Sequence, residues 1–189
     1  MPWVYRGIQY DYKLTMTQTS LTDRILQVSI VVLLGAFAWV IYASIHERVV
    51  QVDDHAPDFS ITADNGRTIT RSEFGGKLLV LNFWASYCAP CIEELPSLDQ
   101  FQRELADQGV VVLGVSIDKD PKAYKQFLEK YNVSFLTARD PDNKINAEYG
   151  TFKIPETYLI NRDGKVVGKI INATNWVDER MISYVKSLL

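Results

Sequence analysis

The chain contains two cysteines, Cys88 and Cys91, which lie in the segment WASYCAPC at residues 84–91. This segment directly follows an apolar run, residues 78–83, where a buried strand should end and a helix begin. One sulfur would then lie at a helix N-terminus, where unpaired N–H groups and the helix dipole favour negative charge. Because the thiolate is the reactive form, Cys88 is the candidate nucleophile. Cys91 would resolve a mixed disulfide formed at Cys88.

A cysteine pair of this spacing has two other uses, as half of a zinc site or as a structural disulfide. Structural zinc needs about four protein ligands. The chain's histidines, His46 and His55, lie upstream, and no second ligand pair accompanies the cysteines. A disulfide that closes so short a loop removes little entropy from the unfolded chain. The spacing therefore favours redox exchange, and we expect no metal and no cofactor.

An uncharged apolar segment at residues 25–45 precedes the cysteine region. As a helix it would be about 31 Å long, which matches the hydrocarbon core of a bilayer. A buried core helix of this length would normally carry a polar stripe. A cleaved signal peptide would have a shorter apolar region followed by small residues at its cleavage site. We therefore expect an uncleaved transmembrane signal-anchor that contacts the lipid bilayer through residues 25–45.

Basic residues are more numerous before this segment than directly after it. Three precede it and one follows closely: Arg6, Lys13, Arg24 and Arg48. The bias predicts that residues 1–24 form a cytoplasmic tail and that the rest of the chain lies outside. Residues 46–56 are expected to be a linker, and residues 57–189 an extracytoplasmic domain.

The composition narrows the class of protein further. The chain has 189 residues, of which 47% are hydrophobic and 23% charged, enough for one well-cored domain plus an appendage. The net charge is −3, and no cluster of Lys and Arg with interleaved aromatics occurs. We therefore expect no nucleic-acid partner.

Strands and helices are expected to alternate in the C-terminal part of the chain. Expected strands cover residues 59–63, 67–70, 78–83, 110–117, 134–137, 157–160 and 166–171. Expected helices cover residues 88–108, 121–131, 143–149 and 177–188. Pro96 falls inside the first of these helices, where it predicts a kink. Alternation followed by an antiparallel hairpin predicts an α/β sandwich with a mixed sheet.

Several motifs resemble the thioredoxin superfamily, and specifically its membrane-anchored TlpA/ResA-like thiol-disulfide oxidoreductases, which include reductants of cytochrome c maturation. They are residues 56–59 (APDF), residues 82–91 (NFWASYCAPC), Pro96 and residues 154–157 (IPET). The resemblance covers residues 56–189, and residues 117–154 resemble the extra strand and helix of this branch. It implies a thioredoxin-like α/β fold, a mixed central sheet flanked by helices, with an N-terminal transmembrane helix.

The resemblance also implies roles for particular residues. Cys88 would be the exposed attacking sulfur and Cys91 the resolving one. Pro155 would be a cis residue facing the disulfide, and the backbone of Ile154 beside it would be open to a partner's extended segment. Glu94 would take part in acid–base handling of the thiols. On the residues alone, two alternatives stay open: Pro155 as an ordinary turn proline and Glu94 as a solvated helix carboxylate.

Two positions depart from the superfamily pattern. Asn82 stands where plain thioredoxin has a buried aspartate, so a proton carrier is missing there and Glu94 would substitute for it. Tyr87 stands where tryptophan is common before the first cysteine. Tyr87, Trp84 and Ile154 are the residues expected to contact the substrate.

The function implied by the resemblance is reduction of disulfides in extracytoplasmic proteins. The expected substrate is apocytochrome c, and a membrane electron donor of the DsbD or CcdA type would recharge the enzyme. The expected location is a bacterial cytoplasmic membrane, crossed once, with the catalytic domain on the periplasmic side.

Three other functions remain open at this point. An oxidant or isomerase would use the same cysteines, although the Ala-Pro dipeptide between them is nearer to the Gly-Pro of reducing thioredoxins. A peroxidase of the peroxiredoxin type would need a threonine where this chain has Ala85. A copper chaperone of the Sco type would have a wider cysteine spacing and a downstream histidine, and this chain has neither.

Overall fold

The computed structural model describes residues 20–45 and 49–189, which belong to two separate units divided after residue 47. The first unit contains helix α1 (Leu21–Ile45), which is long and apolar enough over Leu21–Tyr42 to cross a membrane. The helix begins before residue 25 because Ser20 and Asp23 cap its first turn with reciprocal backbone-to-side-chain hydrogen bonds of 3.1 and 3.3 Å. Residues 1–19 of the predicted cytoplasmic tail lie outside the described residues.

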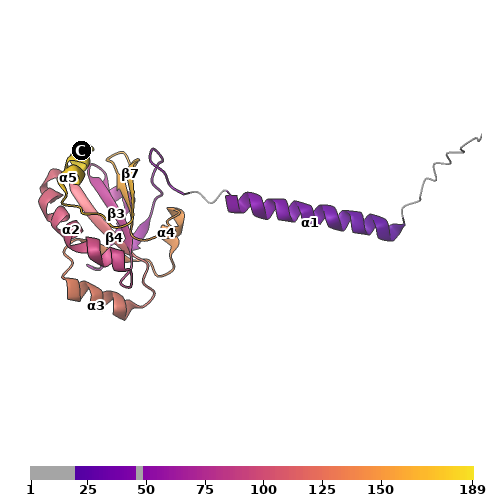
Figure 1. Cartoon of the computed structure of the whole chain (residues 1–189), viewed down its shortest axis with the longest axis horizontal. Helices are drawn as coiled ribbons and strands as arrows, with labels where there is room; N and C mark the ends of the chain where they lie inside the picture. The colour runs from indigo at the N-terminus through magenta and orange to yellow at the C-terminus, as the bar shows by residue number, and fades with distance from the viewer. Residues whose placement is uncertain (1–19, 46–48) are drawn as a thin grey trace, which may run out of the picture. The chain divides into compact units, whose positions relative to one another are not determined.

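The second unit is built on a five-stranded mixed sheet with the order β5-β4-β3-β6-β7. Strands β3, β4 and β7 of this sheet are labelled in Figure 1. Its strands are β3 (Leu78–Trp84), β4 (Val110–Ser116), β5 (Leu136–Arg139), β6 (Glu156–Ile160) and β7 (Val166–Ile171). Strand β4 runs parallel to β3 and β5, whereas β6 runs antiparallel to β3 and β7. This arrangement confirms the predicted thioredoxin-like α/β fold.

Strand β3 lies at the centre of the sheet, and all seven of its residues are buried. Its side chains alternate between two hydrophobic clusters, one on each face of the sheet. Leu79, Leu81 and Phe83 belong to one cluster, and Leu78, Val80 and Trp84 to the other. A continuous apolar run is what a central strand covered on both faces requires.

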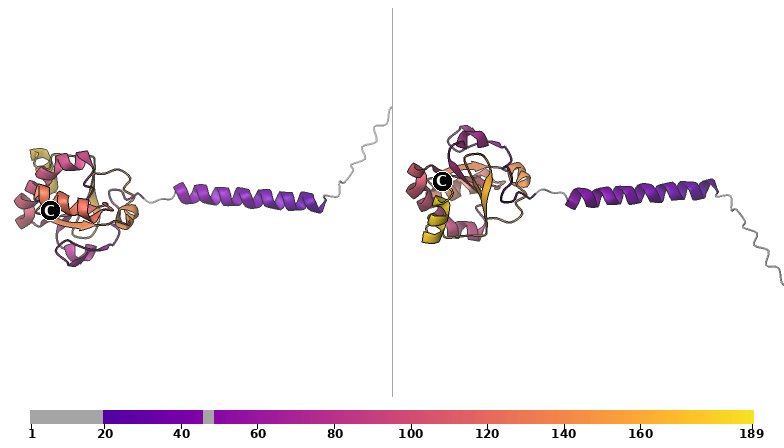
Figure 2. Two further views of the ribbon diagram at one scale, coloured as in Figure 1. Left: turned by 90° about the horizontal axis from the view of Figure 1, so that it is seen from below. Right: turned by 90° about the horizontal axis from the view of Figure 1, so that it is seen from above.

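Helices α2 (Ala89–Leu105), α3 (Pro121–Tyr131) and α5 (Glu179–Lys186) contribute to the cluster that contains Trp84. Helix α5 (yellow) lies close to α2 in both views of Figure 2. The opposite face is covered by the hairpin of β1 (Ser60–Thr62) and β2 (Thr68–Thr70) together with α4 (Lys144–Glu148). Two short 3-10 helices, η1 (Arg71–Phe74) and η2 (Ala106–Gln108), follow β2 and α2.

The folded domain begins before residue 57. The N–H of Val50 donates to the carbonyl oxygen of Tyr149 at 3.1 Å, and the N–H of Ala56 donates to that of Gly164 at 2.9 Å. Val50 and Ala56 are both buried. Residues 50–56, expected to be linker, therefore pack on the domain, and this N-terminal strap is held by backbone hydrogen bonds that leave no periodic pattern in the sequence. Residues 46–48 lie outside the described residues.

Most other boundaries differ from the expected ones by one or two residues. Helix α2 runs through Pro96 and ends at Leu105. The 3-10 turn that follows it stops at Gly109, whose positive φ of 86° favours glycine. Helix α5 begins at Glu179 because Asp178 caps it, accepting a hydrogen bond of 2.9 Å from the N–H of Arg180.

Candidate active site

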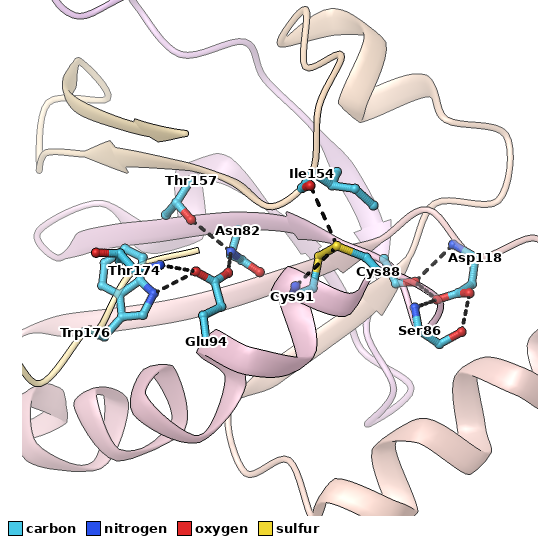
Figure 3. Close-up of a disulfide and its surroundings, with 11 residues drawn as sticks. Asn82, Ser86, Cys88, Cys91, Glu94, Asp118, Ile154, Thr157, Thr174 and Trp176 are labelled. Carbon is cyan, nitrogen blue, oxygen red and sulfur yellow. Dashed lines mark hydrogen bonds between the residues drawn. A yellow bond between two sulfur atoms is a disulfide. The ribbon is translucent and has the colours of Figure 1, made fainter. Parts of the chain in front are cut away.

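Cys88 and Cys91 form a disulfide at the start of α2, with their Cα atoms 5.3 Å apart (Figure 3). Cys88 is the N-cap residue of the helix, and the N–H of Cys91 points at its Sγ at 3.3 Å. Pro90 lies in the first turn, where its missing N–H leaves no hydrogen bond unmade. Cys88 is 8% exposed and Cys91 3%. Cys88 is therefore the more exposed residue of the pair, at a position that stabilises negative charge.

The loop between α4 and β6 lies against this disulfide. The Ile154–Pro155 peptide bond is cis, as the resemblance implied. The carbonyl oxygen of Ile154 lies 3.7 Å from the Sγ of Cys88. In the dithiol form this distance allows the Cys88 thiol to donate to the carbonyl. The backbone of Ile154 therefore flanks the sulfur that a partner must reach.

Glu94 projects from α2 toward the sheet and the C-terminal loop, and it is only 4% exposed (Figure 3). Its Oε1 accepts a hydrogen bond of 2.9 Å from Asn82, and its Oε2 accepts bonds of 3.3 Å from the N–H of Thr174 and the indole N–H of Trp176. Burial raises the pKa of Glu94 to about 7, although these hydrogen bonds favour the charged form and work against that rise. Both protonation states are therefore populated at neutral pH.

Asn82 connects Glu94 to the strand that follows Pro155. Its side-chain nitrogen donates to Glu94 and, also at 2.9 Å, to the hydroxyl oxygen of Thr157 on β6. The Asn82 amide can donate to Glu94 and Thr157 at once, but it does not take up or release a proton near neutral pH. Glu94 is therefore the titratable member of this network, which fits the prediction that it replaces the missing aspartate. Its acid–base role stays a prediction.

The turn before Cys88 is held by Asp118, which the sequence reasoning did not single out. The carboxylate accepts a hydrogen bond of 2.8 Å from the N–H of Ser86 and one of 2.6 Å from its hydroxyl. A third bond of 2.6 Å comes from the hydroxyl of Ser116. Asp118 follows β4, the parallel neighbour of β3. The tendency of functional residues to gather at the carboxyl ends of parallel strands was the signal that could have found it.

Trp84 does not lie at the surface, which corrects its expected contact with substrate. The side chain is 2% exposed and packs against Tyr124 and Phe127, with ring centroids 5.7 and 4.8 Å away. As the last residue of β3, it points into the cluster that α3 covers, which also contains Cys88 and Cys91.

Tyr87, in contrast, is 72% exposed beside Cys88, and Ile154 is half-buried. Tyr87 and Ser86 line an open hollow of about 950 Å³ that continues to Asp118 and Asp142. The positions of Tyr87 and Ile154 are compatible with contact to a bound partner. That contact stays a prediction.

Comparison with known proteins assigns these features to a family. Residues 52–169, more than half of the chain, match the AhpC/TSA family. The chain belongs to the AhpC/TSA family. The thiol-disulfide oxidoreductase ResA of Bacillus subtilis (strain 168) is 31% identical over 162 residues, covering 85% of this chain and 89% of the relative. ResA of Bacillus anthracis is 30% identical over 161 residues, covering 84% and 92%. This AhpC/TSA-family protein is a thiol-disulfide oxidoreductase similar to ResA.

Solved structures agree with this assignment. A DsbE-type thiol:disulfide interchange protein from Chlorobium tepidum has a TM-score of 0.69 and 28% identity, covering 74% of this chain and 98% of its own. StoA from Bacillus subtilis has a TM-score of 0.61 at 22% identity, covering 69% and 97%, and supports the fold.

Proposed function

We propose that this AhpC/TSA-family enzyme reduces disulfides in extracytoplasmic proteins while α1 anchors it in a bacterial cytoplasmic membrane. The observation that carries the proposal is the Cys88–Cys91 disulfide at the N-terminus of α2, in which Cys88 is the more exposed residue. The other features of the site support successive steps of one exchange reaction.

The reaction begins with the dithiol form of the enzyme. The Cys88 thiolate attacks one sulfur of the substrate disulfide, that S–S bond breaks, and the other substrate sulfur leaves as a thiolate. A mixed disulfide now joins Cys88 to the substrate. Cys91 loses its proton and attacks the Sγ of Cys88, and the second substrate thiolate leaves. Two electrons have passed to the substrate, and the enzyme carries the Cys88–Cys91 disulfide.

Glu94 is the proposed acceptor of the Cys91 proton. It lies three residues after Cys91, one turn further along α2, and both residues are buried. Its pKa of about 7 lets it take up and release a proton at neutral pH. Tyr87 and the Ile154 backbone would meanwhile contact the partner on either side of Cys88.

The anchoring and sidedness belong to the same proposal. Helix α1 has the length and composition to cross a bilayer, and the Lys and Arg residues before its uncharged segment at residues 25–45 favour a cytoplasmic N-terminus. A membrane donor of the DsbD or CcdA type would return electrons to the oxidised enzyme on the periplasmic side. A reporter enzyme that works only outside the cytoplasm should therefore be active when it is fused after Leu189. Activity of a reporter that works only in the cytoplasm would contradict this topology.

Apocytochrome c is the proposed substrate, because haem attachment requires its cysteines in reduced form. Similarity to ResA supports the oxidoreductase chemistry, and the choice of substrate is our inference. A strain lacking this protein should accumulate less holocytochrome c, and added dithiothreitol should restore it. Normal holocytochrome c in that strain would remove the assignment.

The direct test of the exchange is to trap the mixed disulfide. In Cys91→Ser, Cys88 can attack but nothing resolves the adduct, so full-length protein in its membrane should accumulate disulfide-linked partners that mass spectrometry identifies. Cys88→Ser is the matched control and should trap none. A folded Cys91→Ser protein without adducts would contradict the assigned order of attack.

A further inference from the structure

The C-terminal loop before α5 approaches Glu94 from the side away from β3. Trp176 is buried, and its indole N–H donates to Oε2 of Glu94 at 3.3 Å, as does the N–H of Thr174. Ser97 fastens the loop to α2. Its hydroxyl donates to the carbonyl oxygen of Glu94 at 2.8 Å, and its oxygen accepts a bond of 3.2 Å from the N–H of Trp176. The loop and the carboxylate are therefore held in one hydrogen-bonded unit.

A hollow of about 360 Å³ opens between this loop and α2, and Glu94 is part of its wall. The remaining lining residues are Glu93, Pro96, Ser97, Ala173, Thr174 and Asn175. Neither Cys88 nor its neighbours Tyr87 and Ile154 line it. Through this hollow, solvent reaches the wall that contains Glu94 on a different face from the one where a partner must meet Cys88.

The groups that face Glu94 are neutral on most sides. Strand β3 contributes Asn82 and the C-terminal loop contributes Thr174 and Trp176, all as hydrogen-bond donors. Helix α2 contributes Cys91, which titrates when reduced, and Glu93, the other charged residue that lines the hollow. With no cation among these residues, burial raises the pKa of the carboxylate, and the hydrogen bonds from Asn82, Thr174 and Trp176 oppose that rise.

We propose that Trp176 is a positioning residue for Glu94 and that Glu94 passes the proton it takes from Cys91 to water in the hollow. The proton would then leave by the flank of α2 while a partner still covers Cys88. The proposal rests on the proposed function of Glu94 as the acceptor.

The step balances within the mixed disulfide. The S–H bond of Cys91 breaks, its proton goes to the Glu94 carboxylate, and its electron pair stays on sulfur. That sulfur forms the bond to Cys88, and the partner leaves as a thiolate. Glu94 then gives its proton to water and returns to the charged form. No further oxidant or reductant is needed.

Trp176→Phe tests the positioning role because it removes the indole N–H and keeps an aromatic ring in place. The reduced full-length protein is mixed with 5,5′-dithiobis(2-nitrobenzoate), whose first released thiolate reports attack by Cys88 and whose second reports resolution by Cys91. Loss of a donor to a carboxylate raises its pKa, so the pH midpoint of the second phase should rise by about one pH unit. The first phase should keep its profile. An unmoved second midpoint would overturn the positioning role.

Two further variants separate the possible failures. Phe101→Leu disturbs the ring that packs on Trp176, 5.3 Å between centroids, but leaves the indole donor, so it should lower stability without moving either midpoint. Glu94→Gln should remove the midpoint that belongs to Glu94 from the second phase and leave only the rise in rate that follows ionisation of the Cys91 thiol itself. If Glu94→Gln has no effect, the proposed function of Glu94 fails. If it has one and Trp176→Phe does not, only the present inference fails.

Chemical rescue tests the route. Glu94→Ala leaves a space that opens on the hollow, so formate should enter and restore the second phase at least severalfold. Adding Ala173→Trp, which fills the hollow, should abolish the rescue and leave the first phase unchanged. Absence of rescue in Glu94→Ala that is folded by circular dichroism, or rescue that persists in the double variant, would overturn the route.

Discussion

At the scale of single residues, the fold keeps an acid inside the protein that water would otherwise leave fully charged. Glu94 is buried and held by neutral donors. Its pKa is about 7 in the folded protein, against an ordinary value of 4.5. The folded state therefore binds this proton more tightly than the unfolded chain does.

This difference predicts a pH dependence of stability. The contribution of Glu94 is fully present below pH 4.5 and is lost as the pH rises through about 7. The loss amounts to at most about 3 kcal/mol, at 1.36 kcal/mol per pH unit. In Glu94→Gln this part of the dependence should vanish. Urea unfolding of the unmodified protein and of Glu94→Gln at pH 4.5 and pH 8 measures this difference. If the free energy of unfolding changes equally with pH in the two proteins, the shifted pKa of Glu94 is contradicted.

Asp118 is predicted to control the turn before Cys88. Asp118→Asn places an amide nitrogen where Ser86 and Ser116 donate, so at least one bond is lost at a cost of about 1–3 kcal/mol. Attack by Cys88 on a small disulfide should slow, because the turn that carries the sulfur loosens. The control is Asp120→Asn, which changes a helix cap at the surface and should leave the rate unchanged. Equal rates in both variants would refute the role.

Sequence reasoning found the residues whose chemistry is local. Cys88, Cys91 and Glu94 lie within one helical segment, so their spacing alone brings them together. Trp176 is 82 residues from Glu94 in sequence and Asp118 is 32 from Ser86. Their contacts exist only after the sheet forms. The expectation that Trp84 contacts the substrate was wrong because the alternation of side chains along β3 directs Trp84 into the core, although it is next in sequence to the active-site motif.

At the scale of elements, close packing between β3, β4 and the segment before β5 fixes the strand that carries the site. Gly114 on β4 pairs with Asn82 on β3. A Cβ at Gly114 would lie 2.8 Å from the ring of Phe135 and 2.9 Å from the indole nitrogen of Trp84. The approach of these rings therefore requires glycine.

Gly114→Ala should consequently destabilise the domain by about 1–3 kcal/mol, which urea unfolding would detect. Phe135→Leu removes one of the two clashing rings. The loss of stability caused by Gly114→Ala should therefore be smaller in the Phe135→Leu background than in the unmodified protein. Strictly additive effects of the two substitutions would show that Phe135 is not the constraint.

The elements themselves were the most predictable part of the fold. The apolar run of β3 and the turn signals around the last hairpin identified strands whose burial pattern is simple. Residues 50–56 were assigned to a linker because their anchoring uses backbone groups, such as the N–H of Asp53 to the carbonyl of Val166 at 2.8 Å. Backbone hydrogen bonds of this kind leave no side-chain signature.

At the scale of the whole molecule, the N-terminal strap makes the domain larger than its motifs suggest. A fragment that begins at Val49 keeps the buried Val50 side chain and the bond from Lys169 to the Val50 carbonyl at 3.1 Å. A fragment that begins at Pro57 loses them and should be less stable by about 2–5 kcal/mol. Urea unfolding of the two fragments measures the difference. Equal stabilities would show that the strap contributes nothing.

The direction of electron flow is also a property of the whole molecule, since it depends on how strongly the fold stabilises the dithiol form. Two carboxylates lie near the pair, Glu94 one turn after Cys91 and Asp118 against the turn before Cys88. Their negative charge offsets part of the stabilisation that the N-terminus of α2 gives a thiolate on Cys88, and weaker stabilisation of the thiolate gives a more reducing couple. We therefore expect the protein to act as a reductant.

The measurement that tests this most directly is the reduction potential of the Cys88–Cys91 couple in the full-length protein, equilibrated in dithiothreitol and glutathione buffers. We predict a value near or below the roughly −270 mV of thioredoxin. A value near the roughly −120 mV of strong oxidants would contradict the account, because the enzyme would then form disulfides rather than reduce them.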